Sequence, residues 1–205
     1  MQIHIRKILT LKILTLALLL SMPAVAHQSP ATHAAHPQDP AARMAEQKQA
    51  IDKFAFMDGV WRGTATQVMP DGTRHVVTQT ERIGPLLGGS IKLMEGRGYN
   101  ADGSTGFNAF AVLSWDVDRQ AYTLGTHAMG YGGDMKFEPA ADGFIWEVPA
   151  GPAMVMRYTA TVRNGRWHEV GDRILSGGKS IRFFEMNLER IGDSNWPTAG
   201  AIPPR

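Results

Sequence analysis

The chain has 205 residues, of which 43% are hydrophobic and 20% are charged, and it contains no cysteine. This composition is typical of a globular protein with one core, and it excludes disulfide scaffolds, thiolate metal sites and cysteine nucleophiles. The formal charge is +2, but three basic residues lie in residues 1–26, and without them 18 basic residues (21 less three) face 19 acidic ones. A balance so close to neutral provides no electrostatic basis for nucleic-acid binding.

Residues 1–26 have the pattern of a secretory signal peptide. A basic start is followed by an apolar run over Ile13–Leu20, and the segment ends in small residues at Ala24 and Ala26. The apolar run is shorter than the ~20 residues that a membrane-spanning helix needs. We therefore predict cleavage near Ala26, a periplasmic or secreted location, and no membrane span in the mature chain.

Residues 27–39 are rich in His, Pro and Ala, and this composition predicts a disordered leader. Three of its residues, His27, His33 and His36, are weak candidates for capturing a metal such as copper, because imidazole is a common metal ligand. Nothing in the pattern fixes them in one geometry, so no resident metal site is predicted.

One helix is predicted over residues 40–57. Asp39 and Pro40 supply a cap and a first turn, and Met44, Lys48, Ile51 and Ala55 fall on one face at helical spacing. We expect this face to pack on the domain that follows. The Pro/Gly-rich residues 192–205 are expected to form a C-terminal tail without regular structure.

Residues 58–191 read as a series of short strands. Turn signals such as Asp71-Gly72, Asp102-Gly103, Asp142-Gly143 and Asn164-Gly165 recur along this region, separated by β-branched and aromatic segments of alternating character. No strand is followed by a helix long enough for a parallel crossover. The pattern predicts an all-β fold: a single antiparallel up-and-down barrel of about ten strands, lipocalin-like, preceded by one helix.

Each predicted strand offers one largely apolar face, and a barrel of this size can enclose a cavity. The predicted lumen residues are apolar or aromatic side chains of two strands together with two histidines that can act as polar handles or as a general base: Met154, Met156, Tyr158, Phe184, Met186, His127 and His168. Five glutamates occur on separate strands, and we expect most of them to face outward: Glu81, Glu95, Glu147, Glu169 and Glu185. Two carboxylates that face each other across the lumen would be able to do acid–base work, but the sequence does not show which of them pair.

The two ends of the strand region resemble lipocalin-like (calycin) barrels. Gly59-Val60-Trp61 opens the first predicted strand, and Arg190 lies near the end of the last. In that group a Gly-x-Trp tryptophan closes one end of the barrel and a late arginine lies across its ring. The resemblance implies that Trp61 and Arg190 form the structural plug, with a cation–π contact worth roughly 1 kcal/mol.

A more specific resemblance covers residues 56–191. Motifs along this region are similar to those of a bacterial lipocalin-like barrel family of unknown function: Trp61-x-Gly63, Pro70-x-Gly72, Glu81, Leu87-Gly88-Gly89, Glu95-Gly96, Trp115-Asp116 and Tyr122. The sequence departs from that family at Ser90, where its members often have arginine. The resemblance extends distantly to nitrobindin, a haem-binding barrel, through Trp61-Arg62-Gly63. In nitrobindin a histidine on the final strand holds the iron. Residues 183–190 of this chain contain no histidine, so haem would need His127 or His168 as its ligand.

The sequence thus predicts an exported barrel that binds a small, mostly apolar molecule in its lumen, without a required cofactor or reaction. One alternative is a barrel enzyme of isomerase or cyclase type that uses a lumen His/Glu pair. Another is haem binding of the nitrobindin type. The chain has no Gly-x-Ser-x-Gly and no His-Glu-x-x-His motif, which argues against two common hydrolase designs. Ligand identity and oligomeric state do not follow from the sequence.

Overall fold

The structure, a computed structural model, describes residues 39–195. The predicted signal peptide, the leader histidines His27, His33 and His36, and residues 196–205 lie outside the described residues. Within them, one α-helix and two 3₁₀ turns accompany ten strands, and no helix of this region is both long and apolar enough to cross a membrane.

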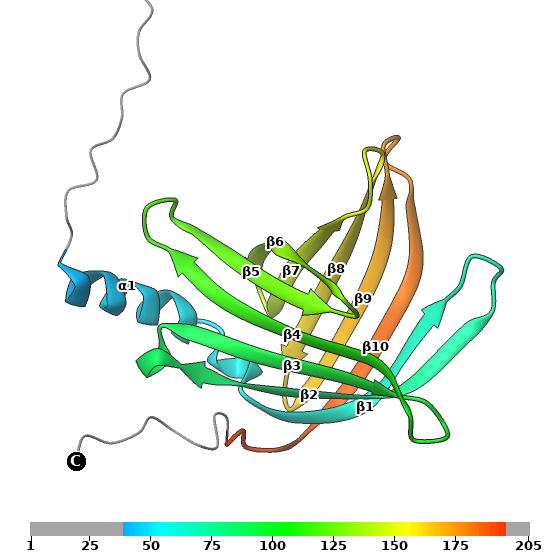
Figure 1. The fold of residues 1–205 in the computed structure, drawn as a ribbon, viewed down its shortest axis with the longest axis horizontal. Coiled ribbons are helices and arrows are strands. Elements are labelled where there is room, and N and C mark those ends of the chain that lie inside the picture. Colours follow the sequence, from blue (N-terminus) through cyan, green and yellow to red (C-terminus); the bar gives the residue numbers. More distant parts are fainter. Residues whose placement is uncertain (1–38, 196–205) are drawn as a thin grey trace, which may run out of the picture. The chain divides into compact units, whose positions relative to one another are not determined.

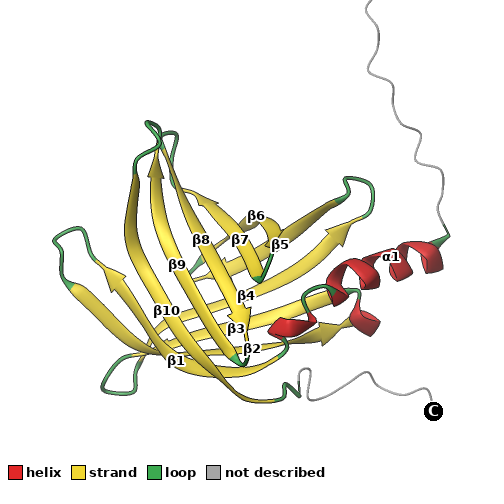
Figure 2. Ribbon diagram, turned by 180° about the vertical axis from the view of Figure 1, so that it is seen from behind, coloured by secondary structure: helices red, strands yellow, loops and turns green. Residues whose placement is uncertain are grey.

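The ten strands form one closed antiparallel barrel, as the turn pattern predicted (Figures 1 and 2). Each strand pairs with its neighbours in sequence, and β1 pairs with β10 to close the sheet. The strands are β1 (Gly59–Val68), β2 (Arg74–Leu86), β3 (Ile91–Tyr99), β4 (Thr105–Asp116), β5 (Ala121–Ala128), β6 (Tyr131–Ala140), β7 (Gly143–Pro149), β8 (Met154–Arg163), β9 (Arg166–Leu175) and β10 (Ser180–Gly192). The predicted fold class is confirmed.

Tight hairpins explain why the chain returns on itself at each strand end. Between β8 and β9, Asn164 and Gly165 have φ values of 53° and 70°. Two consecutive positive φ values give the turn whose twist matches that of the flanking strands, and Asn-Gly adopts it at low cost. The segment Leu87–Gly89 between β2 and β3 instead forms the 3₁₀ turn η2.

Helix α1 (Pro40–Asp52) is shorter than the helix predicted over residues 40–57. It is followed by the 3₁₀ turn η1 (Ala55–Met57). The Asp39 carboxylate caps α1 by accepting from the Ala41 N–H at 3.1 Å. The apolar face begins later than expected, because Met44 is 55% exposed and only Ala50 and Ile51 of α1 are buried.

The chain that leaves α1 seals one end of the barrel. Ile51, Phe54 and Met57 are fully buried and belong to the same core as Trp61. The Phe54 ring makes edge-on contacts with Tyr122 and Phe137, at centroid distances of 5.1 and 5.2 Å. This end is hereafter called the closed end, and the opposite end, which carries the β1–β2 and β5–β6 hairpins, the open end.

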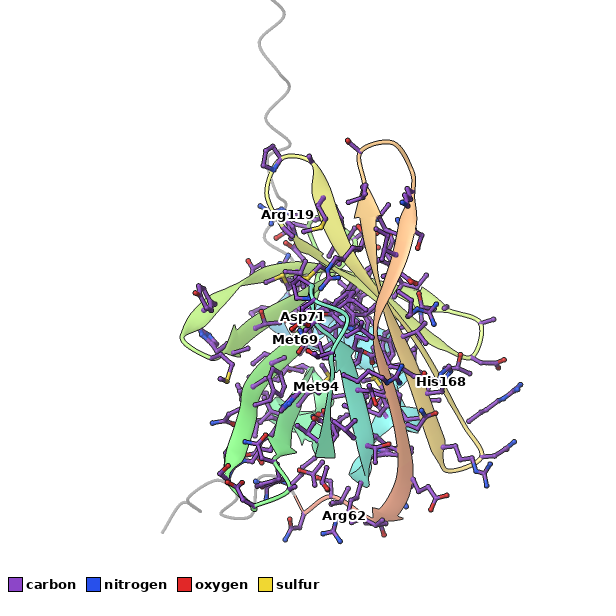
Figure 3. All side chains as sticks on the ribbon, turned by 90° about the vertical axis from the view of Figure 1, so that its right-hand side faces the viewer. Arg62, Met69, Asp71, Met94, Arg119 and His168 are labelled. Carbon is purple, nitrogen blue, oxygen red and sulfur yellow. The ribbon has the colours of Figure 1, made fainter. Side chains whose placement is uncertain are left out.

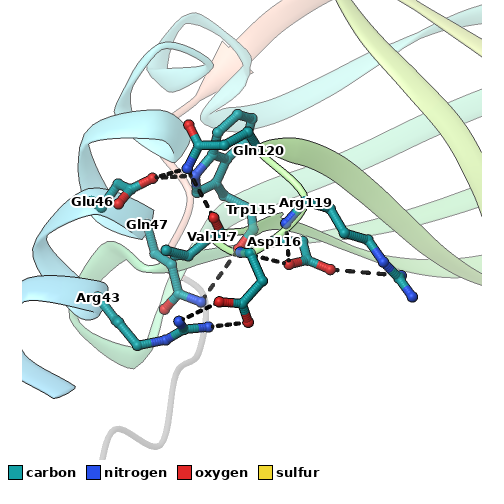
Figure 4. A network of polar contacts seen from close by, with 9 residues as sticks. Arg43, Glu46, Gln47, Trp115, Asp116, Val117, Arg119 and Gln120 are labelled. Carbon is teal, nitrogen blue, oxygen red and sulfur yellow. Dashed lines mark hydrogen bonds and ion pairs between the residues drawn. The ribbon is translucent and has the colours of Figure 1, made fainter. Parts of the chain in front are cut away.

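Polar contacts hold α1 beside the ends of β4 and β5 (Figure 4). Glu46 accepts from Trp115 Nε1 at 3.0 Å and from Gln120 Nε2 at 2.6 Å. Arg43 forms two parallel bonds to the Asp118 carboxylate, at 2.7 and 2.8 Å. The indole bond lowers the pKa of Glu46, and the guanidinium lowers that of Asp118, so both acids stay ionised at neutral pH.

Trp61 is 1% exposed and lies at the closed end, where its Nε1 donates to the Met57 carbonyl at 2.9 Å. Arg190 is opposite Trp61 in the β1–β10 register, but its guanidinium does not make the predicted cation–π contact. Arg190 instead donates to the Asp58 carbonyl and the Asp193 carboxylate, while the Trp61 ring packs edge-on against Trp167 at 5.7 Å. The Arg190 guanidinium is thus held by a carbonyl and a carboxylate oxygen.

Gly63 permits β1 and β10 to approach closely. A Cβ atom at this position would lie 1.9 Å from the Asn187 carbonyl oxygen, which is backbone and cannot turn aside. By contrast, a Cβ at Gly177, in the β9–β10 turn, would meet nothing within 4 Å. The β1–β10 pairing therefore depends on the missing side chain at position 63.

Gly63→Ala is expected to destabilise the protein by about 2 kcal/mol or more, because β1 must move away from β10 to admit the methyl group. Gly177→Ala is the matched control and should change the free energy of unfolding by less than about 1 kcal/mol. Chemical denaturation of both variants measures the difference, and equal stabilities would contradict this account of the closure.

Candidate functional site

The barrel encloses a cavity of about 610 Å³ to which every strand contributes. Its volume lies within the range typical of small-molecule sites, roughly 300–1,000 Å³. Most of its wall is apolar, and it includes several methionines and aromatic rings: Met94, Phe107, Met135, Phe144, Trp146, Met156, Tyr158, Trp167, Phe183, Phe184 and Met186. Such a wall favours an apolar molecule, and methionine adapts to irregular shapes.

The cavity runs from an exposed mouth to a buried floor. At the open end its wall includes Gln67, His75 and Tyr131, all exposed, with Tyr131 at 82%. At the floor, Phe144 and Trp167 are almost fully buried. Because α1 and η1 seal the closed end, the mouth is the side from which a ligand would enter.

One wall of the cavity is built from stacked aromatic rings. Trp146 on β7 and Tyr158 on β8 lie nearly parallel, with centroids 4.1 Å apart and planes at 9°. Phe183 and Phe184 both contact the edge of Tyr158, at 5.7 and 5.6 Å. Consecutive residues usually face opposite sides of a strand, but the β9–β10 register shifts between Arg182 and Phe184, and both phenylalanines line the cavity.

Glu169 on β9 points into this aromatic region. It is 5% exposed, and its two oxygens accept from Trp146 Nε1 at 3.2 Å and from Trp167 Nε1 at 3.1 Å. Two neutral indole N–H groups thus fix the carboxyl group, one on each oxygen. No lysine or arginine among the described residues forms an ion pair with it.

Glu81 on β2 is the second acidic group of the wall. Gln79, two residues earlier on the same face, donates through Nε2 to Glu81 Oε1 at 2.7 Å. On the neighbouring strand, a Cβ at Gly96 would lie only 2.8 and 2.9 Å from the two Glu81 oxygens. Glycine at position 96 therefore leaves the space that the carboxyl group occupies.

Burial shifts the ionisation of both acids toward neutral pH. Desolvation raises the pKa of Glu81 to about 8, and the nearby charges of Glu169 and Glu95 act in the same direction. The hydrogen bond from Gln79 lowers this pKa and offsets part of the rise. Desolvation likewise raises the pKa of Glu169 to about 7, against the two indole hydrogen bonds. Each acid lines the cavity and is otherwise enclosed by protein, which reduces the solvation of its charge.

The structure brings together four of the predicted lumen residues. Met156, Tyr158, Phe184 and Met186 all line the cavity. Met154 does not line the cavity. It lies two residues before Met156, at the first position of β8 near the open end and outside the cavity wall. Its side chain is partly buried on the same face of the strand.

The lumen placement of His127 and His168 is wrong. On β5, Leu124, Thr126 and Ala128 line the cavity, so strand alternation turns His127 outward. On β9, Trp167 and Glu169 face inward, so His168 lies on the outer face (Figure 3). There His168 contacts Glu185 at 3.1 Å, with both side chains about half exposed.

These positions also bear on the two alternatives raised from the sequence. The His168–Glu185 pair exists, but it lies on the outside of the barrel and not in the lumen. Neither His127 nor His168 can reach an iron atom held inside, so the residues named for haem do not fit that group. Among the described histidines, only His75 at the mouth lines the cavity.

Sequence reasoning missed the acceptor-rich part of the site: Gln79, Glu81 and Glu169. Buried glutamate is rare, so the scattered glutamates were expected to face outward. A signal was present for Glu81, because it shares its face with Val77 and Ile83. An acidic residue on the apolar side of an alternating strand was the indication that the cavity contains a carboxyl group.

The fold and the cavity define a hollow antiparallel β-barrel with a potential ligand site in its lumen. The described barrel is similar to the solved structure "Crystal Structure of Rv2717c from M. tuberculosis", with a TM-score of 0.52 and 12% sequence identity, over 69% of this chain and 97% of that chain. No protein-family profile and no curated protein matches the chain. At this identity the likeness establishes the fold alone, a closed antiparallel β-barrel.

The raised pKa of Glu81 predicts that stability falls as pH rises. The folded state holds this proton up to about pH 8, whereas an unfolded glutamate releases it near pH 4.5. The free energy of unfolding should therefore decrease between these pH values, by an amount on the order of a few kcal/mol. Glu81→Gln removes the titrating group and keeps an acceptor for Gln79, so its stability should fall less.

Denaturant unfolding at pH 5 and pH 8.5 measures this difference. Glu189→Gln, a change at an exposed residue of β10, is the control and should lose as much stability across the range as the unchanged protein. Identical pH dependence in all three proteins would contradict a buried, protonated Glu81.

Proposed function

We propose that this protein binds a small, mostly apolar molecule in the lumen of its barrel. One observation carries the proposal: a cavity of about 610 Å³, sealed at one end and lined by methionine and aromatic side chains. A filled barrel would have buried these side chains against each other. Keeping such a wall uncovered costs hydrophobic stabilisation, which a ligand in the cavity restores.

The same proposal includes export of the protein. Its support is the pattern of residues 1–26, with a basic start, an apolar run and small residues before His27. A periplasmic or secreted binding protein without cysteine would have no thiol to be oxidised or paired in that compartment. Size analysis of the protein from a native host tests this part, because cleavage near Ala26 leaves a chain that begins at about His27.

Binding without catalysis is favoured over the enzymatic alternative. That alternative needs an imidazole beside a carboxyl group inside the barrel. His75 lies at the mouth, and Val77 and Gln79 separate it from Glu81 on the same face of β2. The cavity chemistry is therefore that of recognition, with carboxyl and amide acceptors on an apolar wall.

Filling part of the cavity should weaken binding. N-phenyl-1-naphthylamine, a neutral dye that fluoresces in apolar surroundings, is expected to bind the full chain. Ala109→Trp places a large ring inside the cavity and should weaken dye binding by about ten-fold or more, a loss of about 1.4 kcal/mol. The control is Asn108→Trp, at the adjacent exposed residue of β4, which should leave the dissociation constant unchanged. No dye binding, or equal binding by both variants, would overturn the proposal.

A further inference from the structure

Within the described part of the chain, the polar part of the cavity wall contains two acids and no lysine or arginine. Of the charged side chains that line it, Glu81 and Glu169 are acidic, and no lysine or arginine of the described residues is among the lining residues. The only other titratable side chains of the wall are His75 and Tyr131 near the mouth and Tyr158 on the aromatic wall. The deep part of the cavity therefore holds two acids without a described lysine or arginine beside them, and a bound cation would favour the ionised form of each acid.

Two acceptor atoms in this region have no protein donor. Glu81 Oε1 accepts from Gln79, whereas Glu81 Oε2 takes part in no hydrogen bond within residues 39–195. Gln79 donates through Nε2, which leaves its Oε1 without a donor, although the residue is only 4% exposed. Neither atom is sealed away from the cavity, since the only enclosed and unpartnered side-chain atom in the described region is Asn100 Oδ1.

Both acceptor groups line the cavity opposite two glycines of the neighbouring strand. Gly96 and Gly98 of β3 stand opposite Glu81 and Gln79 in the register. A Cβ at Gly96 would approach the Glu81 oxygens to 2.8 and 2.9 Å, and one at Gly98 would come within 3.2 Å of Gln79 Oε1. The two glycines thus leave the space that the carboxyl and amide groups occupy in the cavity wall.

Aromatic rings adjoin the second carboxyl group. Trp146 donates its indole N–H to Glu169 and stacks on Tyr158, so the acid and the ring wall are joined by a direct bond. Each Glu169 oxygen accepts only one donor, and a carboxylate has room for about four. Rings beside carboxylates form the setting in which proteins bind organic cations, because both the ring faces and the acids attract positive charge.

From this arrangement we infer that the lumen takes an organic amine: a protonated amino group held by Gln79, Glu81 and Glu169, attached to an apolar body that lies along the aromatic and methionine wall. The inference rests on the proposed function and specifies its ligand class. An ammonium group carries three N–H donors and a positive charge. Its donors would bond to the unpartnered acceptor atoms, and its charge would pair with the two acids.

Competition against N-phenyl-1-naphthylamine tests the inference on the full chain. The competitors are octylamine, octanol and octanoate, which share one alkyl chain and differ in the head group. At pH 7.5, octylamine should displace the dye at a concentration at least about ten-fold lower than octanol, because a buried charge pair adds to the shared apolar contact. Octanoate should be the weakest of the three, since its carboxylate meets two acids.

Variants locate the amine within the cavity. Glu81→Gln should reduce the affinity for octylamine to that for octanol, while the affinities for octanol and the dye stay unchanged and so show that the cavity is intact. Glu189→Gln, which removes an acid from the outer face of β10, should keep the octylamine preference.

The possible outcomes separate this inference from the proposed function. Absence of dye binding by the unchanged protein overturns both. Dye binding with equal competition by octylamine and octanol overturns the amine inference and leaves binding in the lumen standing. An octylamine preference that survives in Glu81→Gln also overturns the inference, because the amine would then be recognised elsewhere.

Discussion

The pairing of β1 with β10 is the constraint on which the rest of the molecule depends. It joins the first and last strands across almost the whole sequence of the barrel, and it creates the enclosed interior. Gly63 lets the two backbones approach, and Trp61 covers the floor beside Trp167. Loop-closure entropy opposes such a distant contact, so its formation must be supported by the core that Phe54 and Met57 complete. Cavity, carboxyl groups and mouth all follow from this closure.

The interior combines features that oppose folding with features that suit recognition. Burying Glu81 and Glu169 without a cation is unfavourable, and an uncovered apolar wall forgoes part of the hydrophobic stabilisation. The closed end compensates, because Trp61, Phe54 and Ile51 pack there with almost no exposed surface. Local conflicts of this kind tend to occur at functional sites, while the remainder of the fold is internally consistent.

The sequence predicted the fold more completely than the site, and the physical reason lies in how each is encoded. Turn residues such as Asn164-Gly165 and the alternation of side chains are local signals, so ten strands and their antiparallel order could be read from them. The inward face of β9 could not be read in this way. One face carries Trp167 and Glu169 and the other carries His168 and Val170, so each face has one apolar and one polar residue. Choosing between them required the position of neighbouring strands.

Similar limits explain the other differences. The register shift in β10 that turns both Phe183 and Phe184 toward the cavity arises from pairing with β9 and leaves no local mark. Arg190 was expected over the Trp61 ring, but the nearby Asp58 carbonyl and Asp193 are stronger partners. The helix was predicted too long because Phe54 and Met57, which extend its apolar pattern, are recruited to seal the barrel.

Closure of the sheet has a consequence for how this protein can meet others. Over the paired registers of the barrel every strand has a partner on both sides, so this part presents no free row of backbone amides and carbonyls to which a foreign strand could add. Strand-by-strand aggregation and β-augmentation both start from such a row. Within the described residues, backbone pairing with another chain is left only to strand ends beyond these registers, such as residues 74–77 of β2 and 180–183 of β10.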